Sequence, residues 1–489
     1  MVEKIEKLTA AKTVVAALAI GFLFMQGAPS RSASPGSVPG ANTSLKLPPM
    51  VPEHSTSFFI PSSSAPDKGL AVNVIYPVKP RYADGAPVVV VVPGGDEKSG
   101  LDFSMHAAQA GFVEVRFAFP GGGKEGFRSG GTYDQRGPLC EVALRDVIKF
   151  AAGKSNDTKL RTISELVPVK VNSQNMGIVG WSNGGNLLMT TLDKYHSDLQ
   201  NVSWLAFYET PLGSMFYPPA LGSAKDFVTN RHYRQGSAAT GEPAVDYRRM
   251  KFQADASKTP GSHKKVGLPE IPGVVFFDEN NNGVWEESIE FAVPYSSMPA
   301  WPKQIYPPPV TRALARLNVF GKTWNPQVAT IEESELYFKD RDGSLHLKNV
   351  AKAMPHLMVT VFGSRLDHLQ QQPDHPHVSL QYNDWATSGV KWVRLNPDPL
   401  YVSQVGGMNA RNFPNNVPND SIDASDIKSY LEPEGMVPDF IYMDAAIAEM
   451  ADRKKQNKIS AAPLAAPLTS YNNGAAPPPT AADDKQPEK

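Results

Sequence analysis

The chain has 489 residues, of which 41% are hydrophobic and 20% charged, so it is long enough to bury a large core. Its 48 Lys and Arg residues balance 49 Asp and Glu, and a formal net charge of -1 argues against a nucleic-acid-binding protein. A single cysteine, Cys140, excludes an intrachain disulfide and a cysteine-based zinc site. It stands at the start of a predicted amphipathic helix, which favours a buried structural thiol.

The N-terminal segment predicts export. Three lysines precede an apolar run at residues 13–25, and small polar residues follow it, which is the three-part layout of a secretory signal. The run is shorter than the roughly 20 residues that a membrane-spanning helix needs. We therefore expect a periplasmic, cell-surface or extracellular protein. Because no clean Ala-x-Ala site follows the run, an uncleaved membrane anchor is the alternative.

Composition divides the chain into six predicted parts. They are a signal or anchor, a Pro/Gly/Ser-rich linker, the first part of a core, an insertion, the second part of the core and a disordered tail. In that order, their bounds are 1–33, 34–51, 52–210, 211–355, 356–458 and 459–489. The insertion is polar and irregular, and we expect it to cap the edge of the sheet where ligands bind.

Within the core, apolar runs alternate with segments of helical periodicity. The run PVVVVV at 87–92 is typical of a strand buried on both faces. Further strands are predicted at 112–119, 176–181, 202–209, 356–363 and 389–397, with helical segments between several of them. This alternation predicts an α/β fold with a mostly parallel sheet flanked by helices.

The segment GWSNGG at 180–185 contains the candidate nucleophile, Ser182. Glycines two positions before and after the serine permit a sharp turn between a strand and a helix, which exposes the serine Oγ. A second glycine-rich turn, PGG at 93–95, follows the buried PVVVVV strand. The main-chain N–H groups of Gly95 and Asn183 are the candidate donors to an oxyanion.

These motifs resemble the α/β-hydrolase superfamily, in particular the dienelactone-hydrolase and prolyl-oligopeptidase-like esterases and peptidases. The resemblance covers about residues 70–210 and 350–400, and it includes the segment GTYDQRGPLCEVALRDVIKFA that leads to GWSNGG. It implies a Ser–His–Asp triad in the chain order Ser, acid, His. It implies no cofactor for catalysis.

The chain can be matched to the family's strands in two ways, here called registers, and each assigns the acid and the base differently. In the first, residues 356–363 form the seventh strand, and Asp367 takes the place of the acid. The family's histidine follows the eighth strand, but this chain has no histidine after His377. The base would then come from the loop that contains His368, His375 and His377.

In the second register, residues 274–278 (VVFFD) form the seventh strand, Asp278 is the acid, and residues 356–363 form the eighth strand. His368 then falls where the family's histidine is expected. Both registers implicate His368 or its neighbours, and the sequence leaves both open. The remaining histidines are predicted to be surface or packing residues: His54, His106, His196, His232, His263 and His346.

The segment DENNNGVWEESIE at 278–290 matches the first half of an EF-hand-type calcium loop. Oxygen side chains alternate before Gly283, but the position of the closing glutamate is occupied by Ile289. The candidate ligands are Asp278, Asn280, Asn282, the main-chain carbonyl of Val284, and Glu290. A plain Asn/Gly hairpin turn that needs no metal is the alternative.

The sequence therefore predicts an exported serine hydrolase that cleaves an ester, less readily an amide, through an acyl-enzyme. Ser182 attacks the carbonyl, a histidine of residues 368–377 is the base, and Asp367 orients that base. The expected partner is a small-molecule or peptide substrate, with no nucleic acid, and with a membrane only through an uncleaved N-terminal segment. The alternative is a secreted binding or structural protein that keeps the fold without a working base, with or without calcium.

Overall fold

A computed structural model describes parts of the chain between residues 53 and 459. The described residues are 53–95, 97–103, 105–212, 222–223, 228–229, 231–234, 237, 244–254, 273–286, 288–293, 296–298, 301–362, 376–390, 392–395, 439–457 and 459. The predicted signal and linker, and all of the predicted tail except residue 459, lie outside these ranges.

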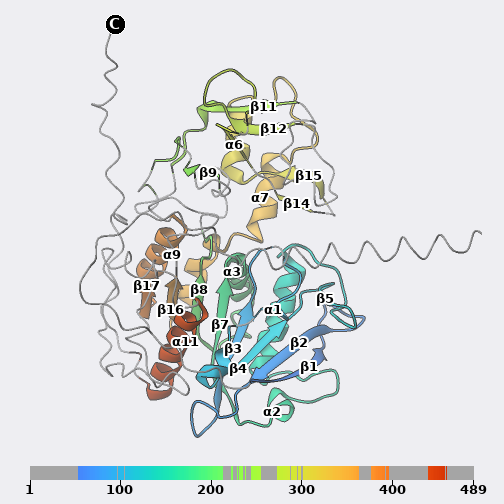
Figure 1. The fold of residues 1–489 in the computed structure, drawn as a ribbon, viewed down its shortest axis with the longest axis vertical. Coiled ribbons are helices and arrows are strands. Elements are labelled where there is room, and N and C mark those ends of the chain that lie inside the picture. Colours follow the sequence, from blue (N-terminus) through green and yellow to red (C-terminus); the bar gives the residue numbers. More distant parts are fainter. Residues whose placement is uncertain are drawn as a thin grey trace, which may run out of the picture. The chain divides into compact units, whose positions relative to one another are not determined.

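An eight-stranded sheet forms the centre of this part of the chain (Figure 1). Its strands are β1 (His54–Ile60), β2 (Leu70–Tyr76), β3 (Ala86–Val92), β4 (Val113–Phe117), β7 (Val171–Trp181), β8 (Val202–Tyr208), β16 (Met358–Phe362) and β17 (Trp392–Leu395). Their order across the sheet is β1-β2-β4-β3-β7-β8-β16-β17. Strand β2 pairs antiparallel with both of its neighbours, and all pairs from β4 to β17 are parallel. The predicted α/β fold with a mostly parallel sheet is therefore confirmed.

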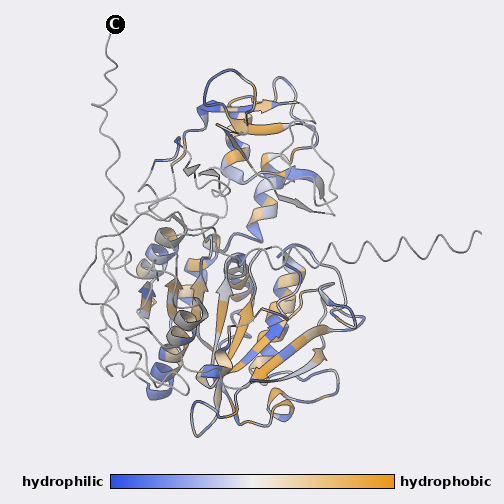
Figure 2. Ribbon diagram, in the orientation of Figure 1, coloured by the Kyte–Doolittle hydropathy of each residue, from blue (hydrophilic) through white to orange (hydrophobic). Residues whose placement is uncertain are grey.

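Helices cover both faces of the sheet. One hydrophobic cluster contains residues of α1 (Pro138–Ala151), α3 (Asn183–Tyr195), α8 (Leu347–Ala353) and α9 (Pro376–Thr387). The other contains residues of η1 (Ala107–Ala110) and α11 (Asp439–Gln456). In β3, Val88, Val90 and Val92 belong to the first cluster, while Val89 and Val91 belong to the second. The predicted two-sided burial of this strand is confirmed, and Figure 2 shows the hydrophobic residues concentrated in such strands.

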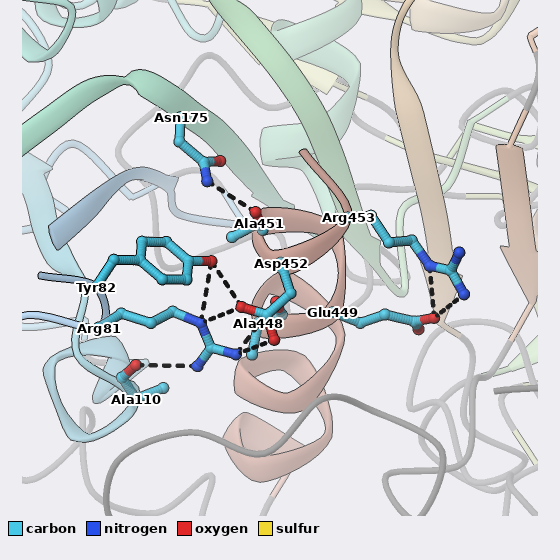
Figure 3. A network of polar contacts seen from close by, with 9 residues as sticks. All are labelled: Arg81, Tyr82, Ala110, Asn175, Ala448, Glu449, Ala451, Asp452 and Arg453. Carbon is cyan, nitrogen blue, oxygen red and sulfur yellow. Dashed lines mark hydrogen bonds and ion pairs between the residues drawn. The ribbon is translucent and has the colours of Figure 1, made fainter. Parts of the chain in front are cut away.

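Buried polar and charged groups attach α11 to strand β7 and to the loop between β2 and β3 (Figure 3). The guanidinium of Arg81 donates to both carboxylate oxygens of Asp452 at 2.7 and 2.6 Å, and the hydroxyl of Tyr82 donates to the same carboxylate at 2.6 Å. The amide of Asn175 in β7 donates to the carbonyl of Ala451 at 2.8 Å. Because a buried charge is costly unless it is paired, these matched partners favour the docked position of the helix.

The segment between β8 and β16 contains small sheets, single turns and short helices. Its elements are β9 (Gly222–Ser223), β10 (Val228–Thr229), η2 (Tyr247–Arg249), β11 (Met250–Gln253), β12 (Val274–Phe277), β13 (Phe291–Ala292), β14 (Ser296–Met298), β15 (Trp301–Ile305), α6 (Pro308–Arg316), α7 (Ile331–Lys339), η5 (Gly343–Leu345) and α8. Several of them bury hydrophobic clusters of their own, one around Tyr306, Val310 and Leu314. Helix α8 instead contributes Leu347 and Val350 to the main core.

Three further short elements connect strands of the main sheet. They are β5 (Gly123–Lys124), β6 (Phe127–Arg128) and α2 (Ile163–Leu166). Strands β5 and β6 form an antiparallel hairpin. Among the described residues, no helix has both the length and the apolar character that a membrane span requires.

The sheet decides between the two registers of the sequence. In chain order, β16 is its seventh strand and β17 its eighth, which agrees with the first register. The second register, with Asp278 as the triad acid, is wrong because β12 pairs with β11 and β13 in a separate three-stranded sheet. The apolar residues of β12 instead belong to two small hydrophobic clusters: Phe277 is buried in one and Phe276 in the other, on opposite sides of the strand.

Candidate functional site

Ser182 stands at a sharp turn between β7 and α3. Its backbone has φ 46° and ψ -128°, a conformation that costs free energy for any residue except glycine. The turn is held by two hydrogen bonds: the N–H of Ser182 donates to the carbonyl of Tyr208 at 2.7 Å, and the N–H of Gly185 donates to the carbonyl of Ser182 at 3.0 Å. The side chain of Ser182 is half-buried. A strained turn of this kind, between a strand and a helix, is the local geometry that a nucleophilic serine requires.

The glycines around Ser182 are required by close backbone contacts. A Cβ at Gly180 would lie 2.6 Å from the Cα of Gly185, across the turn. A Cβ at Gly184 would lie 2.6 Å from the carbonyl oxygen of Pro93, in the loop after β3. Real Cβ atoms do not approach other atoms so closely, so both positions exclude a side chain unless the backbone shifts.

The loop after β3 passes directly beside Ser182. A Cβ at Gly94 would lie 2.7 Å from the Cβ of Ser182, and the side-chain amide of Asn183 donates to the carbonyl of Gly95 at 3.5 Å. The N–H of Asn183 belongs to the first turn of α3, where main-chain N–H groups lack an acceptor within the helix. The structure thus places both predicted oxyanion donors, Gly95 and Asn183, next to the candidate nucleophile.

The predicted base and acid lie mostly outside the described residues. This applies to Asp367, His368 and His375, and of His377 only the backbone, at the start of α9, is described. Their roles stay predictions.

The histidines of the described part have other partners. His54 stacks on Tyr76. Three others contact carboxylates: His106 contacts Glu53, His232 contacts Glu279, and His346 contacts Asp193. The last two contact main-chain carbonyls, His196 that of Asp193 and His356 that of Val202. None of these six is hydrogen-bonded to Ser182. They are packing and surface residues, as predicted for five of them; the sixth, His356, was not assigned a role.

The structure adds a carboxylic acid that the sequence analysis did not single out. Glu209 directly follows β8, with φ 46° and an exposed fraction of 8%. Its N–H donates to the carbonyl of Phe362 in β16 at 3.0 Å, and the preceding carbonyl, of Tyr208, accepts from Ser182. Glu209 therefore lies at the same edge of the sheet as the nucleophile. An acidic residue at the carboxyl end of a predicted apolar strand is the signal that would have found it.

The predicted calcium loop is closed by its own hydrogen bonds. The two carboxylate oxygens of Asp278 accept the N–H groups of Asn282 and Gly283, both at 3.0 Å. Glu290 accepts from the N–H of Glu286 at 2.8 Å, and burial, together with nearby negative charge, raises the pKa of its carboxyl group. No group of three or more His, Cys, Asp or Glu residues in the described ranges is arranged to hold a metal ion. Calcium binding stays a prediction.

Cys140 is fully buried in the first turns of α1. Burial raises the pKa of its thiol, so the reactive thiolate is disfavoured. The prediction of a buried structural cysteine is confirmed.

Comparisons with known proteins give similarities to solved structures at low sequence identity. No protein-family model matches the chain, and no curated protein matches it. Among solved structures, fungal esterases from Rhizomucor miehei share 12% identity over 84% of this chain and 86% of that chain, with a TM-score of 0.39. Brefeldin A esterase, a bacterial homologue of human hormone-sensitive lipase, shares 13% identity over 84% and 80%, with a TM-score of 0.36. Esterase Est22 shares 15% identity over 33% of this chain, with a TM-score of 0.24, and the match spans 45% of that chain.

The sheet and the turn together define the class of fold. A mostly parallel sheet, a strained serine between its fifth strand β7 and helix α3, and a glycine loop after the third strand β3 are the features of an α/β-hydrolase. The resemblance noted in the sequence is confirmed at the level of the fold.

Proposed function

We propose that the protein is a serine hydrolase that cleaves carboxylic esters through an acyl-enzyme. The observation that supports this most strongly is the strained backbone of Ser182, with the backbone of Gly94 and Gly95 packed against it. A turn with this conformation costs free energy, and such strain persists mainly where function requires it. A serine in an ordinary loop has no need of the three close contacts made by Gly94, Gly180 and Gly184.

The proposed reaction uses these groups together with a general base. The Oγ of Ser182 attacks the ester carbonyl carbon while the base takes its proton. The carbonyl oxygen becomes an oxyanion, which accepts hydrogen bonds from the N–H groups of Gly95 and Asn183. The intermediate expels the alcohol, which receives the proton from the base, and leaves an acyl group on Ser182. Water activated by the same base then releases the acid and restores the serine.

The base in this proposal is one of His368, His375 and His377, and Asp367 orients it. Glu209, which lies at the same edge of the sheet as Ser182, is the alternative acid. Single substitutions of the three histidines identify the base, since its removal abolishes most of the turnover. Asp367→Asn and Glu209→Gln distinguish the two acids, because loss of the orienting carboxylate lowers kcat by about 10,000-fold in a well-studied serine protease.

Esters are the proposed substrates because an alkoxide leaves more readily than an amine. The substrate is a small-molecule or peptide ester, and the insertion between β8 and β16 would shape its binding pocket. We further propose that the protein acts outside the cytoplasm, as its N-terminal segment predicts.

Hydrolysis of p-nitrophenyl esters of increasing acyl length tests this function. We expect turnover that Ser182→Ala lowers by at least about 1,000-fold in kcat, because the remaining groups bind substrate but cannot form the acyl-enzyme. A Ser182→Ala variant with unchanged turnover would contradict the proposed nucleophile. A folded wild type that binds but does not hydrolyse any ester of the series would favour the non-catalytic alternative.

A further inference from the structure

Arg136 is a buried arginine in the turn that leads into α1. Its side chain is 1% exposed, and both Arg136 and the preceding Gln135 have left-handed backbones, with φ 66° and 53°. Two consecutive non-glycine residues in this region are uncommon. Such strain is retained where the surrounding structure or the function demands one position of the side chain.

The guanidinium of Arg136 binds the loop that passes beside Ser182. Its Nη2 donates to three main-chain carbonyls, those of Gly94 at 3.0 Å, Gly95 at 3.3 Å and Glu97 at 3.2 Å. The guanidinium carbon also lies 4.1 Å from the centre of the Phe119 ring, within the range of a cation–π interaction. One side chain thus holds three peptide groups of this loop.

The contact with Gly94 determines the direction of a predicted oxyanion donor. The carbonyl of Gly94 and the N–H of Gly95 belong to the same planar trans peptide, so they point in opposite directions. A carbonyl held by Arg136 therefore turns the N–H of Gly95 away from the guanidinium. This peptide lies beside the nucleophile, since a Cβ on Gly94 would lie 2.7 Å from the Cβ of Ser182.

The positive charge of Arg136 has no carboxylate bonded to it among the described residues. Its Nε and Nη1 atoms are buried and have no hydrogen-bond partner there. A guanidinium stays protonated at any physiological pH. Its charge is therefore fixed behind the loop, where it favours negative charge on the substrate oxygen.

The turn that contains Arg136 is itself held in place. Arg341, which follows α7, donates to the carbonyls of Asp134 at 2.8 Å and Gln135 at 3.0 Å. The carboxylate of Asp134 accepts the N–H groups of Gly137 at 3.1 Å and Leu139 at 2.7 Å, at the start of α1. Both ends of the strained turn are thus fixed, and Arg136 is supported by elements distant in sequence.

We propose that Arg136 is a positioning residue of the oxyanion site, which aligns the N–H of Gly95 by holding the carbonyls of the loop after β3. This inference rests on the proposed function. Arg136 does not touch the substrate, so its removal should weaken binding of the transition state and leave binding of the ground state almost unchanged.

The test compares Arg136→Met with Arg81→Met. Arg81 is also a buried arginine, but it binds Asp452 on α11, away from Ser182. We expect Arg136→Met to lower kcat by about 100-fold, the loss typical of one oxyanion donor, with KM changed less than about threefold. The inhibition constant of an alkyl boronic acid, which forms a tetrahedral adduct with an active serine, should rise by a similar factor. Arg81→Met should leave both quantities within about threefold of the wild type.

Equal kcat and equal boronic acid inhibition in Arg136→Met and Arg81→Met would overturn the inference. If Arg136→Met does not fold, Arg136→Lys decides, because lysine retains the charge but cannot hold three carbonyls in the same geometry. A loss of kcat at constant KM in that variant supports the inference, and a wild-type kcat overturns it. Ser182→Ala separates the two proposals: if it remains active, the proposed function fails, whereas an inactive Ser182→Ala beside a fully active Arg136 variant defeats only the inference.

Discussion

Arg81 and Arg136 are both buried arginines, but their guanidinium groups bind different partners. Arg81 forms a two-pronged ion pair with Asp452, and Tyr82 donates to the same carboxylate. Arg136 donates to the carbonyls of the loop beside Ser182 and lies against an aromatic ring. The charge of Arg81 is neutralised by Asp452, and this ion pair attaches helix α11. The charge of Arg136 has no such carboxylate partner among the described residues, so a positive charge remains beside the candidate active site.

The two regions also differ in the strain of their backbones. Four non-glycine residues with positive φ lie around the turn at Ser182: Gln135, Arg136, Ser182 and Glu209. The contacts of α11 with Arg81, Asn175 and Arg394, here called the α11 anchor, instead involve a regular helix. Strain that a protein retains at one edge of a sheet must be offset by stability elsewhere. The neutralised network under α11 is one source of that stability.

The first prediction concerns stability at the α11 anchor. Asp452→Ala leaves Arg81 buried without its carboxylate, and we expect the free energy of unfolding to fall by about 3–5 kcal/mol. Chemical denaturation measures this loss. Tyr82→Phe is the control, since it leaves the ion pair intact and removes only the two hydrogen bonds of the hydroxyl, to Asp452 and from Arg81, each worth about 1 kcal/mol. The kcat of folded Asp452→Ala should equal that of the wild type, and a large fall in kcat would remove the distinction between the two regions.

The second prediction concerns the contact between the loop and the nucleophile. Gly94→Ala places a Cβ 2.7 Å from the Cβ of Ser182, so the loop or the turn must move. We expect kcat to fall by about 100-fold, because a displacement of about 1 Å at a catalytic group has this effect. Gly126→Ala is the control: its φ of 79° also strains the backbone of an alanine, but no atom lies within 4 Å of the added Cβ. Equal kcat values in the two variants would contradict the close packing that the structure shows.

The third prediction concerns the pH dependence of the α11 anchor. Asp444 is fully buried in α11, and burial, with the negative charges of Glu114 and Glu53 nearby, raises the pKa of its carboxyl group well above the ordinary value. The folded state therefore holds this proton more tightly than the unfolded state. The free energy of unfolding should fall as pH rises from about 4 towards the folded-state pKa, by up to about 1.4 kcal/mol per pH unit.

Asp444→Asn removes the titrating group at nearly constant size. Unfolding measured by denaturant at pH 5, 6, 7 and 8 should therefore show a shallower pH dependence in the variant than in the wild type. Identical pH dependence in the two proteins would mean that Asp444 is already ionised in the fold.

The sequence predicted those parts of the molecule whose signal is local. The β-branched run of β3 and the glycine spacing around Ser182 each determine a strand or a turn within a few residues. The apolar run of β12 was ambiguous, because four buried residues look alike in a large sheet and in a small one. Only its pairing with β11 and β13 excluded Asp278 as the triad acid.

The missed features depend on contacts between distant parts of the chain. Arg81 and Asp452 are 371 positions apart, and Arg136 is 42 positions from Gly94. No pattern in a single sequence shows that such residues meet. Helix α11 itself had a signal, since Met443, Ala446, Ile447 and Met450 follow helical spacing and are all buried.

Covalent labelling with a fluorophosphonate probe tests the central claim most directly. The probe phosphonylates an activated serine, and mass spectrometry of the digested protein locates the adduct. We predict one adduct, on the peptide that contains Ser182, in the wild type and none in Ser182→Ala. A folded wild type that remains unlabelled, or that is labelled at another residue, would contradict the assignment of Ser182 as the nucleophile.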